Sequence, residues 1–406
     1  MTLAFPKLPF ELIDNPGADP SAAYGDRQAA VLNAEGLAEA RRCITAWPGY
    51  APTPLVELAG LARELGIARL SYKQEGARFG LKSFKPLGGA FAVERCLIRA
   101  VAEATGEADV DPARILDGTH ADIVSRVTVT AATDGNHGRS VAWGSRMFGC
   151  RCVIFINEAV SAARENAIAD LGAEVRRLKG SYDDAVRHAF KTAREEGWTV
   201  IPDTSDSDIV TAPRDVMQGY ALLADELFEQ LDAAPTHLFL QAGVGGMAAA
   251  VAAEFWRRSD AARPMTILVE PKQAACWFKS LEAGEPTSVT GDIDSFMGGL
   301  SCGECSALAW EILRPGAHAA MIVDDEAAKE TMRLLANGVA GDPPVVGGES
   351  GVAGLAALIT AATDPGAREK LKLDEESRVV VIGSEGAVDE AVFRDVVGRA
   401  SDEVAA

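Results

Sequence analysis

One lysine of this chain has the sequence surroundings of a nucleophilic amine. It is Lys85, which stands between Phe84 and the pair Pro86-Leu87. Because the residue before a proline favours an extended backbone and proline suits the first helical position, we expect Lys85 directly upstream of a helix that runs towards Arg99. The positive end of that helix and partial burial beside Phe84 and Leu87 both disfavour an ammonium, so the neutral amine can attack a carbonyl and form a Schiff base. A solvent-facing lysine at a helix entrance is the alternative interpretation.

Three glycine-containing turns are the other places where the sequence predicts ligand binding. They are Asp134-Gly135-Asn136-His137-Gly138, Gly243-Val244-Gly245-Gly246-Met247 and Gly383-Ser384-Glu385-Gly386. The second turn opens an alanine-rich helix, so bare amides and a helix N-terminus can converge on a phosphate there, although its spacing matches neither a dinucleotide fingerprint nor a P-loop. In the first turn, Asn136 can hydrogen-bond a ring oxygen and the amides at the helix entrance can hold a substrate carboxylate. Ser384 in the third turn can donate to, or accept from, a pyridine nitrogen.

Each turn also has a purely structural interpretation. Glycine in the second turn can serve only the backbone angles of a tight strand-to-helix connection. The first turn can be an Asx turn capped by Asp134 or Asn136. Any one of these segments is therefore weak evidence, and only their combination argues for a cofactor.

The elements that must position these residues are strands alternating with helices. Short apolar, β-branched runs predict strands at residues 127–132, 152–157, 199–202, 237–241, 266–270 and 378–383. This alternation indicates parallel sheets with helices on both faces, in which ligands bind beyond the carboxyl ends of the strands. Polar residues 105–122 are expected to form a surface insertion, and residues 364–376 a charged connection.

Composition excludes several classes of protein. The chain has 406 residues, of which 48% are hydrophobic and 24% charged, so two or three packed units are expected and a fibrous, disordered or disulfide-scaffold protein is not. Lys plus Arg is 39 and Asp plus Glu is 59, a net charge of −20. Acids are spread along the whole length without a basic block, so neither nucleic acid nor a membrane surface is expected as a partner.

Cysteine usage predicts a reducing compartment and no metal. Seven cysteines, an odd number, occur in a chain whose first residues show no signal-peptide pattern, so we expect a cytoplasmic protein. The five histidines lack paired metal spacing. Cys302 and Cys305 form a lone CxxC pair, and Cys276 with Cys302 is an alternative pairing near a site entrance, but ordinary thiols are the simpler interpretation.

Taken together, the segments resemble the fold-type II family of pyridoxal-phosphate enzymes, which includes tryptophan synthase β-subunit and threonine dehydratase. The resemblance extends from Pro52 to Gly386, and within that family the chain is most similar to the diaminopropionate ammonia-lyases. The motifs that carry this closer resemblance are Arg78-Phe79-Gly80-Leu81, Phe84-Lys85, Ala132-Thr133-Asp134-Gly135-Asn136-His137-Gly138-Arg139, Met217-Gln218-Gly219-Tyr220, Gln241-Ala242-Gly243-Val244-Gly245, Gly299-Leu300-Ser301-Cys302-Gly303-Glu304 and Gly348-Glu349-Ser350-Gly351.

The resemblance implies a role for each candidate residue. Lys85 would hold pyridoxal 5'-phosphate as a Schiff base and would be catalytic together with Asp134 and Asp203. The remaining cofactor contacts would come from Phe84, from Asn136 at the phenolic oxygen, from Gly243, Val244, Gly245, Gly246 and Met247 at the phosphate, and from Ser384 at the ring nitrogen. The substrate would meet Ser83, Asp134, Gly135 and His137.

The chemistry implied is α,β-elimination of 2,3-diaminopropionate to pyruvate and two ammonia molecules through aminoacrylate. Lys85 would take the α-proton from one face, and Asp134 would act on the other face or protonate the leaving amine. Serine and threonine dehydratases usually have a small residue at the position of Asp134, so this carboxylate favours the ammonia-lyase. Asp203 would contact the distal ammonium of the substrate, or else be a turn residue. The family is bulkier after this aspartate than Ser205-Asp206-Ser207-Asp208, and it has proline at the position of Cys305.

The expected architecture is two three-layer αβα domains with the cofactor in a cleft between them. The large domain would comprise residues 1–88 and 212–406, the small domain residues 89–211, and the family implies a homodimer acting on a small amino acid. The alternative activities are a serine or threonine dehydratase or another β-eliminating lyase, a nucleotide-binding protein that uses the same turns, and an inactive ligand-binding descendant.

Overall fold

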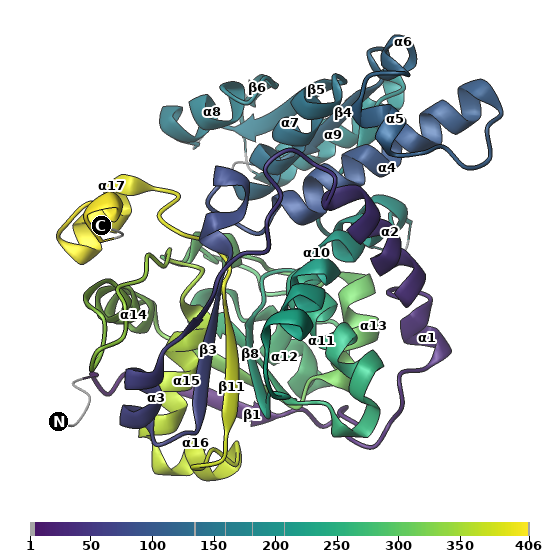
Figure 1. Ribbon diagram of the computed structural model, residues 1–406. Coiled ribbons are helices and arrows are strands. Elements are labelled where there is room, and N and C mark those ends of the chain that lie inside the picture. Colours follow the sequence, from purple (N-terminus) through teal and green to yellow (C-terminus); the bar gives the residue numbers. More distant parts are fainter. Residues whose placement is uncertain (1–4, 134, 159, 181, 207, 405–406) are drawn as a thin grey trace. The chain divides into compact units, whose positions relative to one another are not determined.

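The chain forms two compact units (Figure 1). The computed structural model describes residues 5–133, 135–158, 160–180, 182–206 and 208–404. Apart from the gaps in that range, the larger unit contains residues 5–31, 52–84 and 223–404, and the smaller unit contains residues 32–51 and 85–222. The expected boundaries differ from this division mainly at residues 32–51 and at residues 212–222, which belong to the smaller unit.

Side-chain contacts explain why residues 32–51 belong to the smaller unit. Helix α2 (Ala34–Ile44) packs on helix α4 (Pro86–Thr105). The buried Trp47 indole donates to the Glu94 carboxylate at 3.1 Å, and Arg95 pairs with Glu39. These contacts join segments about fifty residues apart, so they cannot be predicted from the local sequence pattern.

The larger unit is built on a seven-stranded sheet. Its strand order is β1-β10-β9-β8-β11-β3-β2, with five parallel strands in the centre and an antiparallel strand at each edge. The strands are β1 (Phe10–Asp14), β2 (Leu55–Glu57), β3 (Arg69–Gln74), β8 (His237–Gln241), β9 (Met265–Pro271), β10 (Ala319–Val323) and β11 (Arg378–Gly383).

Helices cover both faces of this sheet, and Figure 1 shows α3, α14 and α15 on one side and α11, α12 and α13 on the other. The helices are α1 (Asp26–Ala29), α3 (Ala59–Leu65), α11 (Gly246–Ser259), α12 (Cys276–Ala283), α13 (Ala307–Gly316), α14 (Asp325–Asn337), α15 (Ala353–Thr363), α16 (Pro365–Lys370), α17 (Glu390–Val397) and α18 (Ser401–Val404), with short 3₁₀ helices η1 (Glu75–Gly80), η2 (Asp260–Ala262), η3 (Lys272–Ala274) and η4 (Gly298–Leu300). Helix α10 (Thr211–Gln230) crosses the boundary of the two units.

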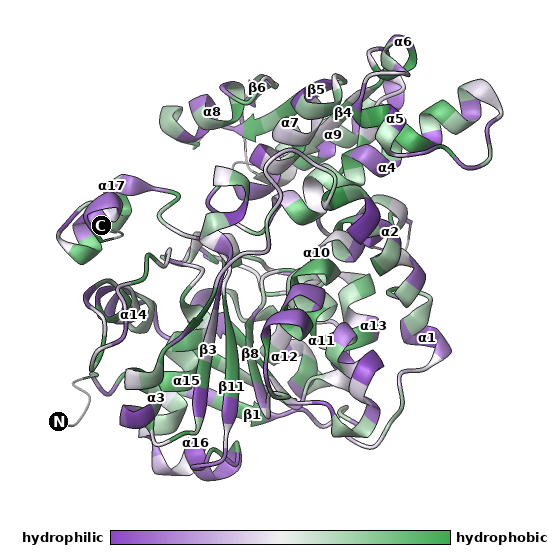
Figure 2. Cartoon of the chain, viewed as in Figure 1, coloured by the Kyte–Doolittle hydropathy of each residue, from purple (hydrophilic) through white to green (hydrophobic). Residues whose placement is uncertain are grey.

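Burial on both faces accounts for the apolar central strands. Every residue of β8 and β10 is buried. Phe239 and Val381 pack with Leu355 and Leu358 of α15 in the main core. Figure 2 shows hydrophobic colour over most of the length of β8 and β11, as expected for parallel strands covered on both sides.

The smaller unit has a four-stranded parallel sheet in the order β6-β5-β4-β7. Its further elements are α5 (Ala113–Leu116), α6 (Ala121–Val124), β4 (Thr128–Ala132), α7 (Asn136–Phe148), β5 (Arg151–Asn157), α8 (Ala162–Ala169), β6 (Glu174–Leu178), α9 (Tyr182–Glu196) and β7 (Thr199–Val200). Val153 and Phe155 of β5 pack with Ala189 of α9, whereas Ile154 faces Gly138 of α7. Alternate residues of one strand thus meet helices on opposite faces.

All six strands expected from the sequence are confirmed, and so is a helix that starts at Pro86. The strands that were not predicted are β1, β2, β3, β6 and β10. Three of them are sheet edges, and one of these edges, β6, contains the charged residues Glu174, Arg176 and Arg177. The two polar segments contain short helices: α5 and the start of α6 lie in residues 105–122, and α16 lies in residues 364–376. No helix among the described residues has the length and apolar character needed to cross a membrane.

Candidate active site

Lys85 lies at the start of α4, as its sequence predicts. Its backbone is helical, with φ −52° and ψ −32°, so the expected extended conformation is wrong. The reason is that the Lys85 carbonyl accepts the amides of Gly88 at 3.1 Å and Gly89 at 2.9 Å. These first helical hydrogen bonds outweigh the preference that Pro86 imposes on its neighbour.

The side chain of Lys85 forms an ion pair that the sequence argument missed. Its Nζ donates to Oδ2 of Asp203 at 2.7 Å, and the two side chains are 19% and 25% exposed. Asp203 follows β7, which is the parallel neighbour of β4. The electrostatic surroundings of the amine are therefore set by a carboxylate distant in the sequence as well as by the helix end and by burial.

His137 is the third member of this group. It lies in the first turn of α7, only 5% exposed, with Nε2 2.7 Å from the Ile201 carbonyl and Nδ1 3.9 Å from Asp203 Oδ2. A carbonyl only accepts, so Nε2 carries the proton. Burial is the largest influence on His137 and lowers its pKa, against the opposing charge of Asp203. The imidazole is thus neutral at physiological pH.

Asp203 is ionised in this arrangement. Its own burial is the largest single influence and favours the neutral acid, but the charge and the hydrogen bond of Lys85 oppose it and hold the pKa of Asp203 well below its ordinary value. The site therefore contains a charged carboxylate paired with an amine.

Tyr220 approaches the same amine because two helices come unusually close. A Cβ at Gly219 of α10 would lie 1.9 Å from the Leu87 carbonyl oxygen, and a Cβ at Gly88 would lie 2.4 Å from the Tyr220 ring. Only glycine allows this approach. The Lys85 Nζ lies 5.9 Å from the centroid of the buried Tyr220 ring. We call Lys85, Asp203, His137 and Tyr220 the lysine cluster. Tyr220 belongs to one of the motifs shared with the family, but no role was expected for it from the sequence.

The turn before α7 is described except for Asp134, which lies outside the described residues. Gly135 is the N-cap of α7 in an extended conformation, without a side-chain capping bond. Asn136 is the first helical residue and its Oδ1 accepts from Arg139 at 3.3 Å. Asn136 is therefore a residue of the helix and not its cap, and Asp134, the other cap expected from the sequence, lies outside the described residues.

In the larger unit, residues 243–247 form a glycine turn between β8 and α11. Gly245 is the N-cap of α11, with φ +97° and no side-chain capping bond. The Gly243 carbonyl accepts the Trp277 indole N–H at 2.9 Å, and the Val244 carbonyl accepts the Ser306 amide at 2.9 Å. The first amides of a helix have no partner within the helix. The glycine turn thus presents amides that suit an anion.

Ser384 lies at the end of β11, the neighbour of β8, and is 4% exposed. Its Oγ accepts from Gln241 Nε2 at 2.8 Å. A hydroxyl that accepts one hydrogen bond keeps its own hydrogen and a second lone pair, so both roles expected from the sequence stay open. Gln241 belongs to the family motif that continues into the glycine turn, but its contact with Ser384 was not expected from the sequence.

The backbone before Lys85 is fixed against the Ser384 segment. The Phe84 amide donates to the Ser384 carbonyl at 3.0 Å, the Gly386 amide donates to the Lys82 carbonyl at 2.9 Å, and Ser83 pairs with Glu385 in an antiparallel bridge. Phe84 and Ser83 therefore hold the peptide chain that leads directly into Lys85.

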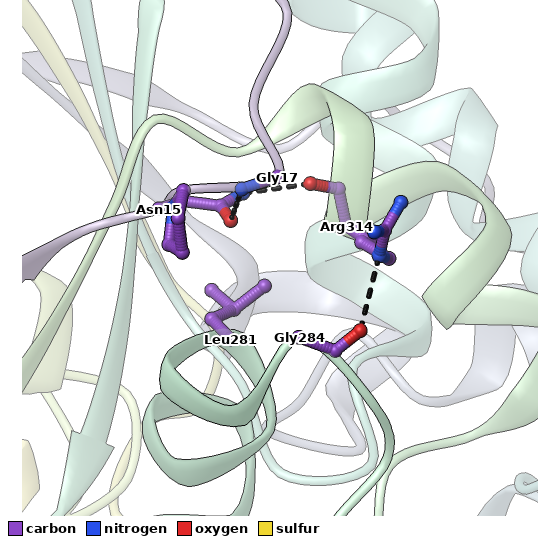
Figure 3. Close-up of a pocket in the computed structure, with 6 residues that line it drawn as sticks. Asn15, Gly17, Leu281, Gly284 and Arg314 are labelled. Atoms are coloured by element: carbon purple, nitrogen blue, oxygen red, sulfur yellow. Dashed lines mark hydrogen bonds between the residues drawn. The ribbon is translucent and has the colours of Figure 1, made fainter.

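Two cavities of the larger unit lie away from the predicted site residues, and the larger of them, of about 420 Å³, is lined by Trp310, Glu311, Arg314 and their neighbours. A cavity of about 120 Å³ is lined by Asn15, Pro16, Gly17, Leu281, Gly284 and Arg314 (Figure 3). It is smaller than the roughly 300–1,000 Å³ of ordinary ligand sites and includes no predicted site residue. All seven cysteines are free thiols, and the described residues contain no cluster of three or more His, Cys, Asp or Glu side chains that suits a metal.

Comparison with known proteins gives consistent matches. A family model described as pyridoxal-phosphate dependent enzyme matches residues 46–385. The diaminopropionate ammonia-lyase of Escherichia coli K12 is 38% identical over 363 residues, which are 88% of this chain and 90% of that protein. A threonine dehydratase of Haemophilus influenzae is 29% identical over 57% of this chain and 42% of its own length.

Solved structures agree with the sequence matches. The crystal structure of holo diaminopropionate ammonia-lyase from Escherichia coli has a TM-score of 0.85 and 35% identity, covering 96% of this chain and 97% of that one. The same enzyme in complex with an aminoacrylate-PLP azomethine reaction intermediate has a TM-score of 0.82 at the same identity and coverage.

Proposed function

The chain belongs to the pyridoxal-phosphate-dependent enzymes and, within them, to the diaminopropionate ammonia-lyases, and from this premise we propose how it acts. It eliminates the β-amine of 2,3-diaminopropionate, releases aminoacrylate and, with one water, yields pyruvate and two ammonia molecules. The observation that carries the proposal is the contact of Lys85 Nζ with Asp203 at 2.7 Å, a nucleophilic amine beside a carboxylate that suits a dicationic substrate.

Pyridoxal 5'-phosphate fits the residues present. The glycine turn offers uncapped amides to its phosphate, and a Cβ at Gly245 would fill the space at the turn, 2.2 Å from the Trp277 ring. Ser384 offers a hydroxyl hydrogen to its ring nitrogen, and Asn136 a side chain to its phenolic oxygen. The cofactor supplies a conjugated ring that takes up the electrons left when the α-proton departs.

The side chains of the lysine cluster would divide the proton transfers. Lys85 would hold the cofactor aldehyde through Nζ, and the same atom would accept the α-proton of the substrate. Asp203, ionised beside it, holds the distal ammonium of the substrate. Asp134 acts on the other face or protonates the leaving amine, and Ser83, Gly135 and neutral His137 line the substrate position.

A labelling experiment tests the covalent role of Lys85. Borohydride reduction of the yellow protein should attach the cofactor to the peptide that contains Lys85, and Lys85→Ala should abolish turnover and labelling together. Lys329→Ala, which changes a lysine of α14 paired with Glu326, should change neither. Label on another lysine, or turnover that survives in Lys85→Ala, contradicts the proposal.

The substrate is tested by keto-acid release. Pyruvate should form faster from a diaminopropionate enantiomer than keto acid forms from serine or threonine. The reverse order would assign a serine or threonine dehydratase, whose relatives match a smaller part of the chain.

We also propose a cytoplasmic homodimer. The seven free thiols support a reducing compartment, and the family resemblance supports the dimer. Cell fractionation and the molar mass of the purified protein in solution test these two statements.

A further inference from the structure

Trp277 makes two direct contacts with the glycine turn. It lies in the first turn of α12, completely buried, and its indole Nε1 donates to the Gly243 carbonyl at 2.9 Å. Its six-membered ring lies over Gly245, where an added Cβ would be 2.2 Å from Cζ2. One side chain therefore fixes the orientation of a carbonyl at one end of the turn and the space available in its middle.

The Trp277 ring is itself held in place. The amides of Trp277 and Phe278 donate to the two carboxylate oxygens of Glu270 at 2.8 Å and 2.7 Å. Glu270 belongs to β9, the parallel neighbour of β8, so the start of α12 is attached to the sheet beside the strand that leads into the turn. The indole also stacks on Trp310, with ring centroids 5.9 Å apart and an interplanar angle of 29°.

Because peptide units are planar, the hydrogen bond from Trp277 to the Gly243 carbonyl also fixes the direction of the next amide. In a trans peptide the C=O and the following N–H point to opposite sides. Because the Gly243 carbonyl points to Trp277, the Val244 N–H points away from it. The Val244 carbonyl accepts the Ser306 amide at 2.9 Å, so the Gly245 N–H, on the same peptide unit, points away from Ser306. Two successive amides are oriented by bonds made to their preceding carbonyls.

We propose that Trp277 is a positioning residue for cofactor binding, which orients the amides of the glycine turn towards the phosphate without touching the cofactor. This inference rests on the proposed function, since the phosphate is that of pyridoxal 5'-phosphate. It predicts that Trp277 contributes to the affinity for the phosphate group of the cofactor and not to the affinity for its pyridine ring or its aldehyde.

The test compares two ligands on the apoenzyme. Pyridoxal 5'-phosphate and pyridoxal, which lacks the phosphate, are titrated by visible absorption against wild type, Trp277→Phe and Trp256→Phe. In Trp277→Phe, the lost hydrogen bond should weaken pyridoxal phosphate binding about threefold to tenfold. Pyridoxal binding should stay within about twofold. Trp256→Phe removes a matched indole-to-carbonyl hydrogen bond, of 2.8 Å to Ala22, near the other end of α11 and should alter neither affinity beyond about twofold.

A second variant guards against misfolding of Trp277→Phe. Gly245→Ala presses a methyl group on the same ring and should give the same pattern, weaker binding of pyridoxal phosphate and unchanged binding of pyridoxal. Equal losses for both ligands, or no loss for either, overturn the positioning role. A wild-type chain that binds neither ligand overturns the proposed function and the inference together, and this outcome is recognised before any variant is examined.

Discussion

Asp203→Asn removes the negative charge beside the Lys85 amine while keeping the shape of the side chain. The lost contact is a charge-assisted hydrogen bond of 2.7 Å between partly buried groups. Such bonds contribute about 1.5–3 kcal/mol, and about 1.4 kcal/mol is tenfold in rate, so kcat/KM for diaminopropionate should fall roughly tenfold to a hundredfold.

The substrate dependence of this loss separates two roles for Asp203. If the carboxylate holds the distal ammonium, the loss should be at least about tenfold larger for diaminopropionate than for β-chloroalanine, which has no distal amine. Pyruvate release is measured for both substrates across the pH range. Because the pKa of Asp203 lies well below its ordinary value, the wild-type carboxylate stays ionised throughout neutral pH and should contribute no inflection there.

Asp206→Asn is the matched control. Asp206 lies on the same connection and accepts the amides of Asp208 and Ile209, both at 2.8 Å, so its hydrogen bonds to described residues go to the backbone. It should leave both activities within about twofold. Equal losses for the two substrates in Asp203→Asn would refute a contact with the distal ammonium, and unchanged kinetics would refute any role of the pair with Lys85.

Three further predictions concern stability and cofactor retention. Gly245→Ala should cost about 1–3 kcal/mol more than Gly284→Ala in denaturant unfolding, because both residues have positive φ but only Gly245 faces a buried ring, and equal costs would contradict the packing argument. Burial alone would raise the pKa of Glu226, but Arg78 and Lys73 outweigh burial and lower that pKa. The ionised Glu226 therefore stabilises the fold above about pH 4.5, and this stabilisation is lost as the pH falls. Glu226→Gln should therefore lose about 3–5 kcal/mol at neutral pH and show a flatter acid dependence than wild type; parallel curves would argue against it. Ser384→Ala should weaken pyridoxal and pyridoxal phosphate equally, by about twofold to tenfold in absorption titrations, whereas a loss confined to the phosphorylated ligand would exclude a ring contact.

The sequence determined the features that depend on a few consecutive residues. Pro86 starts the helix beyond Lys85, and glycines give the turn between β8 and α11 its backbone angles, so both could be located from the chain alone. The apolar strands were recognisable because burial on both faces requires continuous hydrophobic residues. Resemblance of several such segments to one family then indicated the cofactor and the reaction.

Tertiary structure decided which groups meet. Lys85 and Asp203 are 118 residues apart, and no local pattern indicates that one neutralises the other. Strand β3 escaped prediction because it contains Lys73, whose buried amine donates to the Glu226 carboxylate at 2.6 Å and to oxygens of Thr53 and Gln230. The Trp277 contact with the glycine turn likewise depends on the order of neighbouring strands.

The difference between the two kinds of information has a physical origin. The backbone preferences of proline and glycine act within one or two residues, so their effects can be predicted from the sequence. Ion pairs and hydrogen bonds between buried side chains depend on distance in space, which the packing of sheets and helices fixes only after the chain has folded. For this protein, the sequence determined the turns and the helix start at Lys85, and the fold decided the charge beside that lysine and the direction of the amides in the glycine turn.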